Sequence, residues 1–255
     1  MTGYMELAKL GVFSPVYVKE LTGNKKTGYS LLNRLMKKGM VKKIRQNMYS
    51  CVNPTTNQVV ASRYQIACAV NDSAYLSHHT AFEYHGFANQ VFYEVFISSI
   101  TKFREFEFDG INYKYVASKL KDGVIQAKNS EGIWVTDLER TVIDSIKDYE
   151  KIGGFEELIN CLESVHYLDE EKLKRYLMGY SIQALYQKAG FLLAHYMKGM
   201  QISQQFIAFC KSKIGKSTRY IVKESLAVNY YISEWKLVVP EGLFKIADQG
   251  GDELV

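Results

Sequence analysis

The fold is best indicated by residues 14–52, which read SPVYVKELTGNKKTGYSLLNRLMKKGMVKKIRQNMYSCV. Ser14-Pro15 combines an N-cap residue with proline at the first helical position, so a helix is predicted over Val16–Leu21. Thr22-Gly23-Asn24 then predicts a tight turn, because glycine and asparagine tolerate the backbone angles of turns.

A second helix of this stretch is predicted from about Lys25 to Lys38, because Gly39 is the residue type favoured just past a helix end. Wound at about 100° per residue, it has two faces. The apolar face carries Leu31, Leu32, Leu35 and Met36, with Gly28 and Gly39. The opposite face carries Lys26, Thr27, Ser30, Asn33, Arg34 and Lys37. Amphipathic helices are common on any domain, but a face with cations, Ser and Asn and without an acid suits phosphates and base edges.

The residues that follow predict two short strands, Met40–Ile44 and Met48–Val52, joined by the polar turn Arg45-Gln46-Asn47. A short helix is also predicted upstream, around Met5–Leu10. Helix, turn, helix and basic hairpin is the order of a winged helix-turn-helix, in which the second helix of the motif enters the DNA major groove. We therefore predict a winged helix-turn-helix DNA-binding domain over residues 1–53. The alternative is a winged-helix module that contacts only protein.

The predicted partner of this segment is double-stranded DNA. Lysines would contact phosphates, polar side chains of the second helix would contact base edges, and Arg45 would reach the backbone or minor groove from the hairpin. Tyr29 lies at the edge of the polar face and could serve the core or the DNA. The predicted DNA-binding residues are Lys25, Lys26, Thr27, Tyr29, Ser30, Asn33, Arg34, Lys37, Lys42, Lys43, Arg45, Gln46 and Asn47.

The charge distribution favours a polyanionic partner at one end of the chain. The 255 residues carry a formal net charge of +5. Residues 1–50 contain ten Lys/Arg and two Asp/Glu, a net charge of +8, whereas the remainder has a net charge of −3. A basic segment on a mildly acidic body is typical of nucleic-acid-binding proteins. Charge alone is equally compatible with a solvated lysine-rich face.

Beyond the polar linker Asn53–Gln58, a second, larger domain is predicted over residues 58–245. A helix is predicted across Val60–Val70, and Ser77 is predicted to cap a short helix that Gly86 ends. β-Branched and aromatic runs then predict the strands of a sheet. These runs are Val91–Ile97, Phe106–Phe108, Ile111–Val116 and Gly132–Val135.

After the predicted sheet, Thr136-Asp137-Leu138-Glu139 fits a capping box at the start of a helix. The chain is then predicted to be mostly helical to about residue 225, with a last strand at Trp235–Val239. The predicted fold class is therefore mixed α+β: a winged helix-turn-helix followed by a larger α/β-type domain with a central sheet and several helices. The order of the strands does not follow from the sequence.

Three groups of residues suggest catalytic or metal chemistry, and each has a simpler structural explanation. His78, His79, Glu83 and His85 lie in one short segment and form a candidate metal group. His78 and His85 are too far apart along a helix to share one ion, and His79 and Glu83 have the i, i+4 spacing of ligands, but no third ligand is evident. Gly215-Lys216-Ser217 resembles the end of a phosphate-binding loop, yet the upstream glycine is missing and the lead-in predicts a helix. A catalytic carboxylate set could be formed by Asp137, Glu139, Arg140 and Asp144. The capping box explains Glu139, the helix dipole explains Asp137, and an i, i+4 ion pair explains Arg140 and Asp144. We predict no catalytic residues, cofactor or metal.

The cysteines and the N-terminus favour a cytoplasmic protein. Cys51, Cys68, Cys161 and Cys210 form no C-x-x-C pair, and the first residues do not have the pattern of a signal peptide. Such cysteines are usually small core residues in a reducing compartment. Since no stretch approaches the length of a membrane span, no membrane partner is predicted.

Several segments together resemble the AbiEi family of antitoxins from bacterial abortive-infection, or type IV toxin–antitoxin, systems. Besides the head, the resemblance rests on residues 75–86, YLSHHTAFEYHG, and on residues 135–144, VTDLERTVID. Residues 189–193, AGFLL, and residues 235–241, WKLVVPE, complete it. Leu138 stands where similar proteins often have proline before Glu-Arg-Thr, a mild departure.

The resemblance implies a repressor that binds the operator of its own operon. It also implies that the second domain counteracts a nucleotidyltransferase-like toxin encoded alongside, in phage defence, without a stable complex with that toxin. Two other hypotheses remain open from the residues: a winged-helix-guided nuclease or nucleotidyltransferase, and a protein-interaction adaptor. Metal-dependent activity lost on changing Asp137 or Asp144 would indicate the enzyme, and absence of salt-sensitive DNA affinity would indicate the adaptor.

Overall fold

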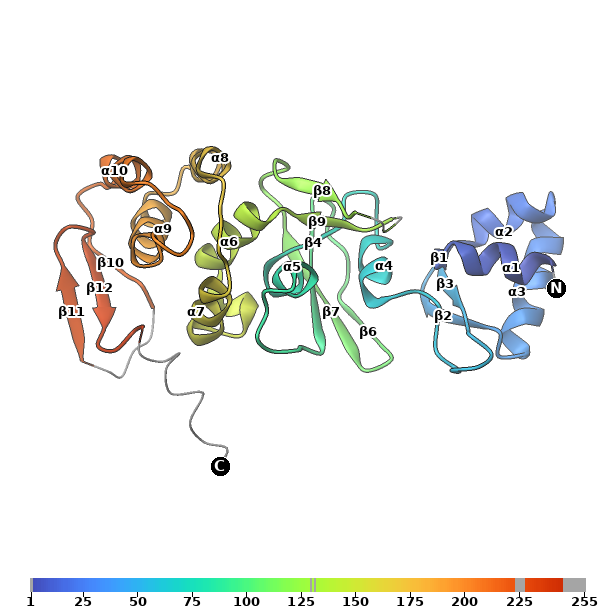
Figure 1. Ribbon diagram of the computed structural model, residues 1–255. Helices are drawn as coiled ribbons and strands as arrows, with labels where there is room; N and C mark the ends of the chain where they lie inside the picture. Colours follow the sequence, from blue (N-terminus) through green and yellow to red (C-terminus); the bar gives the residue numbers. More distant parts are fainter. Residues whose placement is uncertain (1, 129, 131, 223–227, 245–255) are drawn as a thin grey trace, which may run out of the picture. The chain divides into compact units, whose positions relative to one another are not determined.

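A computed structural model of the chain describes residues 2–128, 130, 132–222 and 228–244. Helices and short β-sheets alternate along these residues, which confirms the mixed α+β class (Figure 1). Contacts group the chain into two compact units. Unit 1 comprises the described residues up to Leu76 together with 93–118 and 126–135; unit 2 comprises 77–92, 119–125 and the described residues from Thr136 onwards. The domain boundary predicted at residues 53–58 stays a prediction.

The first part of unit 1, which we call the head, is built from three helices and a small sheet. The helices are α1 (Thr2–Lys9), α2 (Pro15–Thr22) and α3 (Lys25–Lys37). The strands are β1 (Val12–Phe13), β2 (Val41–Arg45) and β3 (Met48–Cys51), in the order β1-β3-β2 and antiparallel throughout. Their apolar side chains share one core, composed of Leu7, Phe13, Val18, Leu32, Leu35, Val41 and Cys51.

The rest of unit 1 is a sheet with one helix packed on it. The helix α4 (Arg63–Cys68) contacts β4 (Tyr75–Leu76) and β5 (Glu94–Ser99). In unit 1 the strand order is β6-β7-β5-β4-β9. The remaining strands are β6 (Phe106–Phe108), β7 (Ile111–Ala117) and β9 (Trp134–Thr136). The pairs β5–β7 and β4–β9 are parallel, and the others are antiparallel. Strand β8 (Val124–Gln126) spans the boundary of the two units.

Unit 2 is mainly helical. Its helices are α5 (His78–His85), α6 (Leu138–Lys147), the 3-10 turn η1 (Tyr149–Ile152), α7 (Phe155–Glu163), α8 (Glu170–Tyr180), α9 (Gln183–His195) and α10 (Gln204–Ser212). A three-stranded sheet follows. Its strands lie in the order β10 (Arg219–Tyr220), β12 (Leu237–Pro240) and β11 (Asn229–Ile232). One large apolar core joins these elements. Gly190 of α9 allows close packing, because a Cβ there would lie 2.3 Å from the Trp235 ring.

Helix ends in the head follow the predicted residue chemistry. The Ser14 hydroxyl accepts a hydrogen bond from Tyr17 N, with Pro15 in the first turn of α2. The predicted hairpin and the helix beginning at Lys25 are confirmed, although α3 ends at Lys37 and Lys38 is its C-cap. The first helix was placed too late, since α1 begins at Thr2.

Several predictions for the second domain were wrong in detail. Helix α4 is shorter than the predicted Val60–Val70, because the Ser62–Gln65 capping box sets its start. Ser77 makes no side-chain capping bond to α5; its hydroxyl contacts His78 Nδ1. The predicted capping box at Thr136 is also wrong, since Asp137 is the N-cap of α6 and accepts from Arg140 N.

The strands differ from the predicted ones mainly where they are very short. The two-residue strands β1, β4 and β10, together with β8 and β11, were not predicted. Trp235 lies in the turn before β12 instead of within the strand. The predicted helical stretch reaches residues 223–225 and the predicted domain ends at residue 245; both positions lie outside the described residues.

Candidate functional site

Helix α3 is held at its start by two local features. The Asn24 side-chain oxygen accepts hydrogen bonds from Lys26 N at 2.8 Å and Thr27 N at 3.3 Å, so it caps the first turn. Gly28 faces α2, where a Cβ would lie 3.1 Å from both the Lys19 Cα and the Thr22 hydroxyl. A larger residue at this position would push the two helices apart. The orientation of α3 is therefore fixed by residues that do not belong to its outer face.

The outer face of α3 is exposed along the whole helix. All eight predicted DNA-contacting residues of α3 are exposed, namely Lys25, Lys26, Thr27, Tyr29, Ser30, Asn33, Arg34 and Lys37. Tyr29 is 50% exposed, so it lies on the outer face and not in the core. The helix contains no Asp or Glu. Among the described residues, no ion pair engages the side chains of its lysines or of Arg34. These cations are free to meet an external anion.

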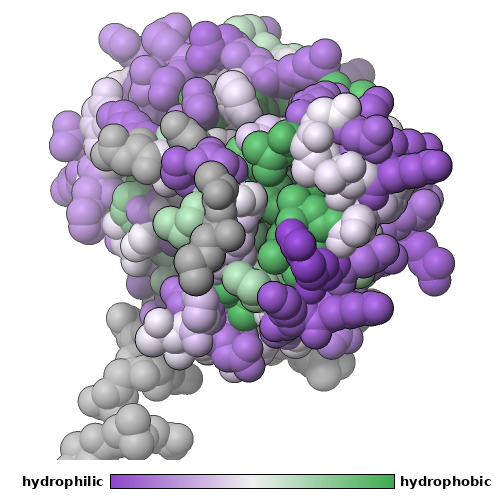
Figure 2. All heavy atoms as spheres, turned by 90° about the vertical axis from the view of Figure 1, so that its right-hand side faces the viewer, coloured by the Kyte–Doolittle hydropathy of each residue, from purple (hydrophilic) through white to green (hydrophobic). Residues whose placement is uncertain are grey.

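A groove of about 800 Å³ lies along one side of this face. Its lining combines residues of α1, the end of α2 and α3: Gly3, Glu6, Leu21, Thr22, Lys26, Thr27, Ser30, Leu31 and Arg34. Figure 2 shows a patch of hydrophobic residues bordered by hydrophilic ones on the face turned to the viewer. The contributions of Glu6 and Leu31 to the groove could not be predicted from the sequence, because they depend on how α1 packs beside α3.

The hairpin carries the other predicted DNA-binding residues, and they fall into two groups. Lys43, Gln46 and Asn47 are exposed, with Asn47 at φ 62° in the turn. Arg45, in contrast, lies over the ring of Phe106, with its Cζ 4.8 Å from the ring centroid, and 5.9 Å from that of Phe103. The cation of Arg45 is therefore already engaged within unit 1.

Lys42 is engaged by the same part of the sheet. Its Nζ lies 3.7 Å from Asp109 in the turn between β6 and β7. Both partners are close to half exposed, so this ion pair is worth little by itself. Together with the Arg45 contacts, it positions the hairpin of the head against the β6–β7 hairpin. The sequence carries no signal for this contact, because its partners lie about sixty residues further along the chain.

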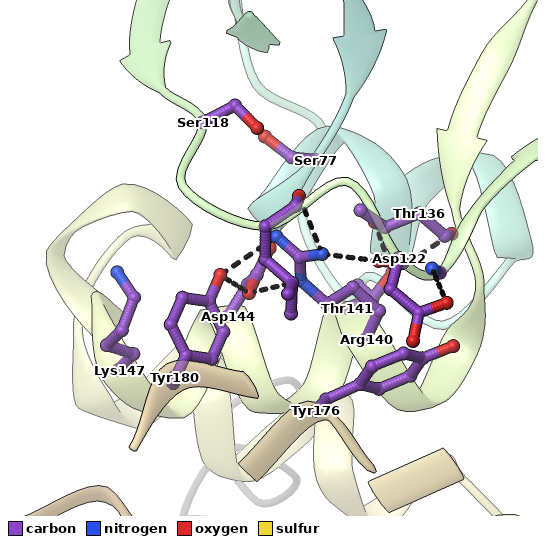
Figure 3. A network of polar contacts seen from close by, with 12 residues as sticks. Ser77, Ser118, Asp122, Thr136, Arg140, Thr141, Asp144, Lys147, Tyr176 and Tyr180 are labelled. Carbon is purple, nitrogen blue, oxygen red and sulfur yellow. Dashed lines mark hydrogen bonds and ion pairs between the residues drawn. The ribbon is translucent and has the colours of Figure 1, made fainter. Parts of the chain in front are cut away.

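A second polar cluster lies in unit 2, and its central cation is buried and paired, unlike the exposed cations of α3. Arg140 on α6 is 1% exposed and donates to the Asp144 carboxylate at 2.8 Å, as the i, i+4 spacing predicted. It also donates to the backbone oxygens of Leu120 and Asp122 and to the Tyr180 hydroxyl (Figure 3). Tyr180 in turn donates to Asp144. Burial, and then the neighbouring Asp144 carboxylate, hold the pKa of Tyr180 well above its usual value.

Asp137 and Glu139 complete this cluster at the start of α6. The Asp137 carboxylate accepts from Arg140 N at 2.9 Å and from the Tyr176 hydroxyl at 2.6 Å. Glu139 accepts from Asp169 N at 3.0 Å and from Lys172 Nζ at 3.1 Å. Burial lowers the pKa of Lys172, but the two carboxylates outweigh it and raise the pKa above its usual value. These contacts tie α6 to α8.

The histidines predicted as a candidate metal group have separate partners. The His78 Nε2 lies 3.6 Å from the Asp148 carboxylate, and the His79 Nε2 lies 3.6 Å from the Glu157 carboxylate. His85 contacts the Thr136 carbonyl oxygen at 2.7 Å. Over the part of the chain that the structure describes, no three His, Cys, Asp or Glu side chains are grouped to hold a metal ion. The four cysteines are buried and free, as predicted.

The segment Gly215-Lys216-Ser217 follows a helix, as the residues before it predicted. The preceding residues form α10, a helix, instead of the strand that leads into a phosphate-binding loop. The Gly215 carbonyl accepts a hydrogen bond from Lys236 Nζ at 2.7 Å. The segment is thus part of the connection between α10 and β10.

Comparison with known proteins gives a likeness of fold. The chain is similar to the RV2827C protein from Mycobacterium tuberculosis, whose crystal structure aligns with a TM-score of 0.65 over 93% of this chain and 90% of that chain. The identity is 15%, so the likeness concerns the fold. No protein-family model and no curated protein sequence matches the chain. Within the described ranges, the helices are too short or too polar to cross a membrane.

Proposed function

We propose that the head is a winged helix-turn-helix that binds double-stranded DNA through α3 and the β2–β3 hairpin. The observation that carries the proposal is the outer face of α3, where exposed lysines and Arg34 have no described ion pair and the helix itself contains no acid. Exposed cations on a helix attract DNA phosphates, and Ser30, Asn33 and Arg34 can hydrogen-bond to base edges. The order of helices and hairpin agrees with this motif.

We further propose that the protein is a non-catalytic regulator of the AbiEi antitoxin type, acting in the cytoplasm. On this proposal, the head binds the operator of its own operon. The remaining domain opposes a nucleotidyltransferase-like toxin encoded alongside, without a stable complex with it. The support for this part is the resemblance carried by residues 75–86 and 135–144 together with the basic head.

The test is the affinity of the purified chain for duplex DNA from upstream of its own gene, with Arg34→Ala as the decisive variant. Losing a bidentate contact from Arg34 to a base should cost about 1–3 kcal/mol in binding free energy and relax specificity at one base pair. Arg104, an exposed arginine outside the head, is the matched control, and Arg104→Ala should bind like the wild type. Equal affinities of the wild type and Arg34→Ala would contradict the assignment of α3.

A further inference from the structure

In the small sheet of unit 2, buried and partly exposed residues alternate along the central strand β12. Ile221, Leu237 and Val239 are buried in the helical core. Figure 1 shows the three strands of this sheet. The strand register pairs Tyr220 with Val238 and Val238 with Tyr231, so these three residues form one row across β10, β12 and β11, on the face opposite Leu237 and Val239. This row crosses the whole width of the sheet.

Two tyrosine rings of this row face solvent. Tyr220 is 60% exposed and Tyr231 is 56% exposed, with the partly exposed Val238 between them. Adjacent strands lie about 4.8 Å apart, so the two tyrosines, one strand removed from each other, are separated by about 10 Å. A flat sheet surface with two exposed rings at this separation is a platform on which planar groups can stack.

The segment that leads into β10 adds positive charge beside the platform. Residues 211–219 contain Lys211, Lys213, Lys216 and Arg219 and no acid. Lys213 and Lys216 are exposed, and neither takes part in an ion pair within the described ranges. Arg219 pairs with Leu237 in the register, so it lies on the face opposite Tyr220. The neighbouring acids are already engaged: Glu234 pairs with Lys211, and Glu241 is hydrogen-bonded to Tyr230.

We propose that this surface, which consists of Tyr220, Tyr231 and residues 213–216, binds single-stranded nucleic acid. Bases would stack on the two tyrosine rings, and the backbone phosphates would contact Lys213 and Lys216. A duplex does not fit this chemistry, because its bases are stacked on one another and their faces are covered. The site is distinct from the head, so the chain would bind duplex DNA and a single strand through different surfaces.

The experiment measures binding of the full chain to fluorescent single strands of about 12 nucleotides, one of RNA and one of DNA, by anisotropy. Tyr220→Ala with Tyr231→Ala should weaken binding about tenfold or more, because each stacked base is lost. Tyr231→Phe keeps the ring and should bind like the wild type. Tyr167→Ala is the matched control, since Tyr167 is 58% exposed elsewhere in unit 2.

A second pair of variants tests the charges independently of the rings. Lys213→Gln with Lys216→Gln should weaken binding and reduce its salt dependence, while the exposed Lys198→Gln should not. If the RNA and DNA strands differ in affinity, the difference identifies which of the two this surface prefers. The proposal is overturned if the wild type binds neither strand, or if the tyrosine and charge variants both bind as the wild type does.

The duplex-binding surface of the head and the single-strand-binding surface can be distinguished by the opposite effects of two variants. Arg34→Ala should lower duplex affinity and leave single-strand affinity unchanged. The double tyrosine variant should do the reverse. Loss of single-strand binding in Arg34→Ala would overturn this proposal by placing that activity in the head, whatever the outcome for the duplex.

Discussion

Two arginines on two helices have opposite surroundings. Arg34 on α3 is exposed, and within the described residues it has no ion pair. Arg140 on α6 is 1% exposed and donates to Asp144, to two backbone oxygens and to Tyr180. A buried guanidinium is fully used in holding its neighbours, whereas an exposed one is available to a ligand. Environment, and not residue type, therefore separates the proposed DNA-binding surface from a structural centre.

The largest expected effect follows from removing the buried cation. Arg140→Met should lower the free energy of unfolding by about 3–5 kcal/mol, because Asp144 would keep a buried charge without its partner. Urea denaturation measures this loss. The exposed Arg175, which pairs with Asp122, is the control: Arg175→Ala should leave the free energy of unfolding close to the wild-type value. Equal losses in the two variants would remove the contrast between buried and exposed arginines.

A smaller effect, dependent on pH, is expected at Asp148. Burial would raise the pKa of this carboxyl, but His78, Lys147 and Lys151 outweigh it and hold the pKa well below the usual value. A carboxyl whose pKa is lowered by folding stabilises the protein at pH values above its ordinary pKa of about 4. That stabilisation is lost progressively as the pH falls from about 4 toward the lower pKa of the folded state. Asp148→Asn should therefore be less stable than the wild type by about 1–2 kcal/mol at pH 7.

The difference in stability between Asp148→Asn and the wild type should shrink as the pH is lowered from about 5 to 3, since the carboxyl of the unfolded wild type then takes up a proton while that of the folded protein stays ionised. Urea denaturation at several pH values measures it. Asp72→Asn, at an exposed position, serves as the control. A difference that stays constant over this range would show that Asp148 does not stabilise unit 2 through its charge.

Arg45 in the hairpin of the head is intermediate between the exposed Arg34 and the buried Arg140, because its guanidinium lies over the rings of Phe106 and Phe103. Phe106→Leu should free Arg45 and raise duplex DNA affinity by up to about fivefold, the worth of an exposed cation–π contact of about 0.5–1 kcal/mol. Phe108→Leu, two residues along the same strand, is the control. Weaker DNA binding by Phe106→Leu would mean that the ring contacts help the hairpin to bind DNA.

The smallest effect concerns a single exposed lysine. Lys37→Gln on α3 should weaken binding of all duplex sequences alike and reduce the salt slope by about 1, since one phosphate contact is lost. Titrations at several salt concentrations measure the slope, with the exposed Lys102→Gln as the control. An unchanged slope in Lys37→Gln would place this lysine outside the contact surface.

Features set by neighbouring residues in the sequence were predictable. The starts of helices α2 and α3 follow from Ser14-Pro15 and Asn24. The exposed face of α3 follows from its 3.6-residue period. The Arg140–Asp144 pair follows from i, i+4 spacing in the same way.

Features that depend on distant parts of the chain were not predictable. Glu139 was interpreted as part of a local capping box, yet its carboxylate contacts Asp169 and Lys172, about thirty residues away. Arg45 was expected at the tip of the hairpin, yet it lies over rings supplied by the sheet of unit 1. The two-residue strands carry too little periodicity to be identified before their partners are known.

The central claim is that the head binds DNA specifically through its exposed basic face. Its most direct test compares binding of the full chain to DNA from upstream of its own gene with binding to scrambled DNA, at about 50 mM and 200 mM salt. The account predicts a preference for the upstream DNA and a marked loss of affinity at the higher salt concentration. Equal affinity for both sequences, or affinity that does not respond to salt, would contradict it.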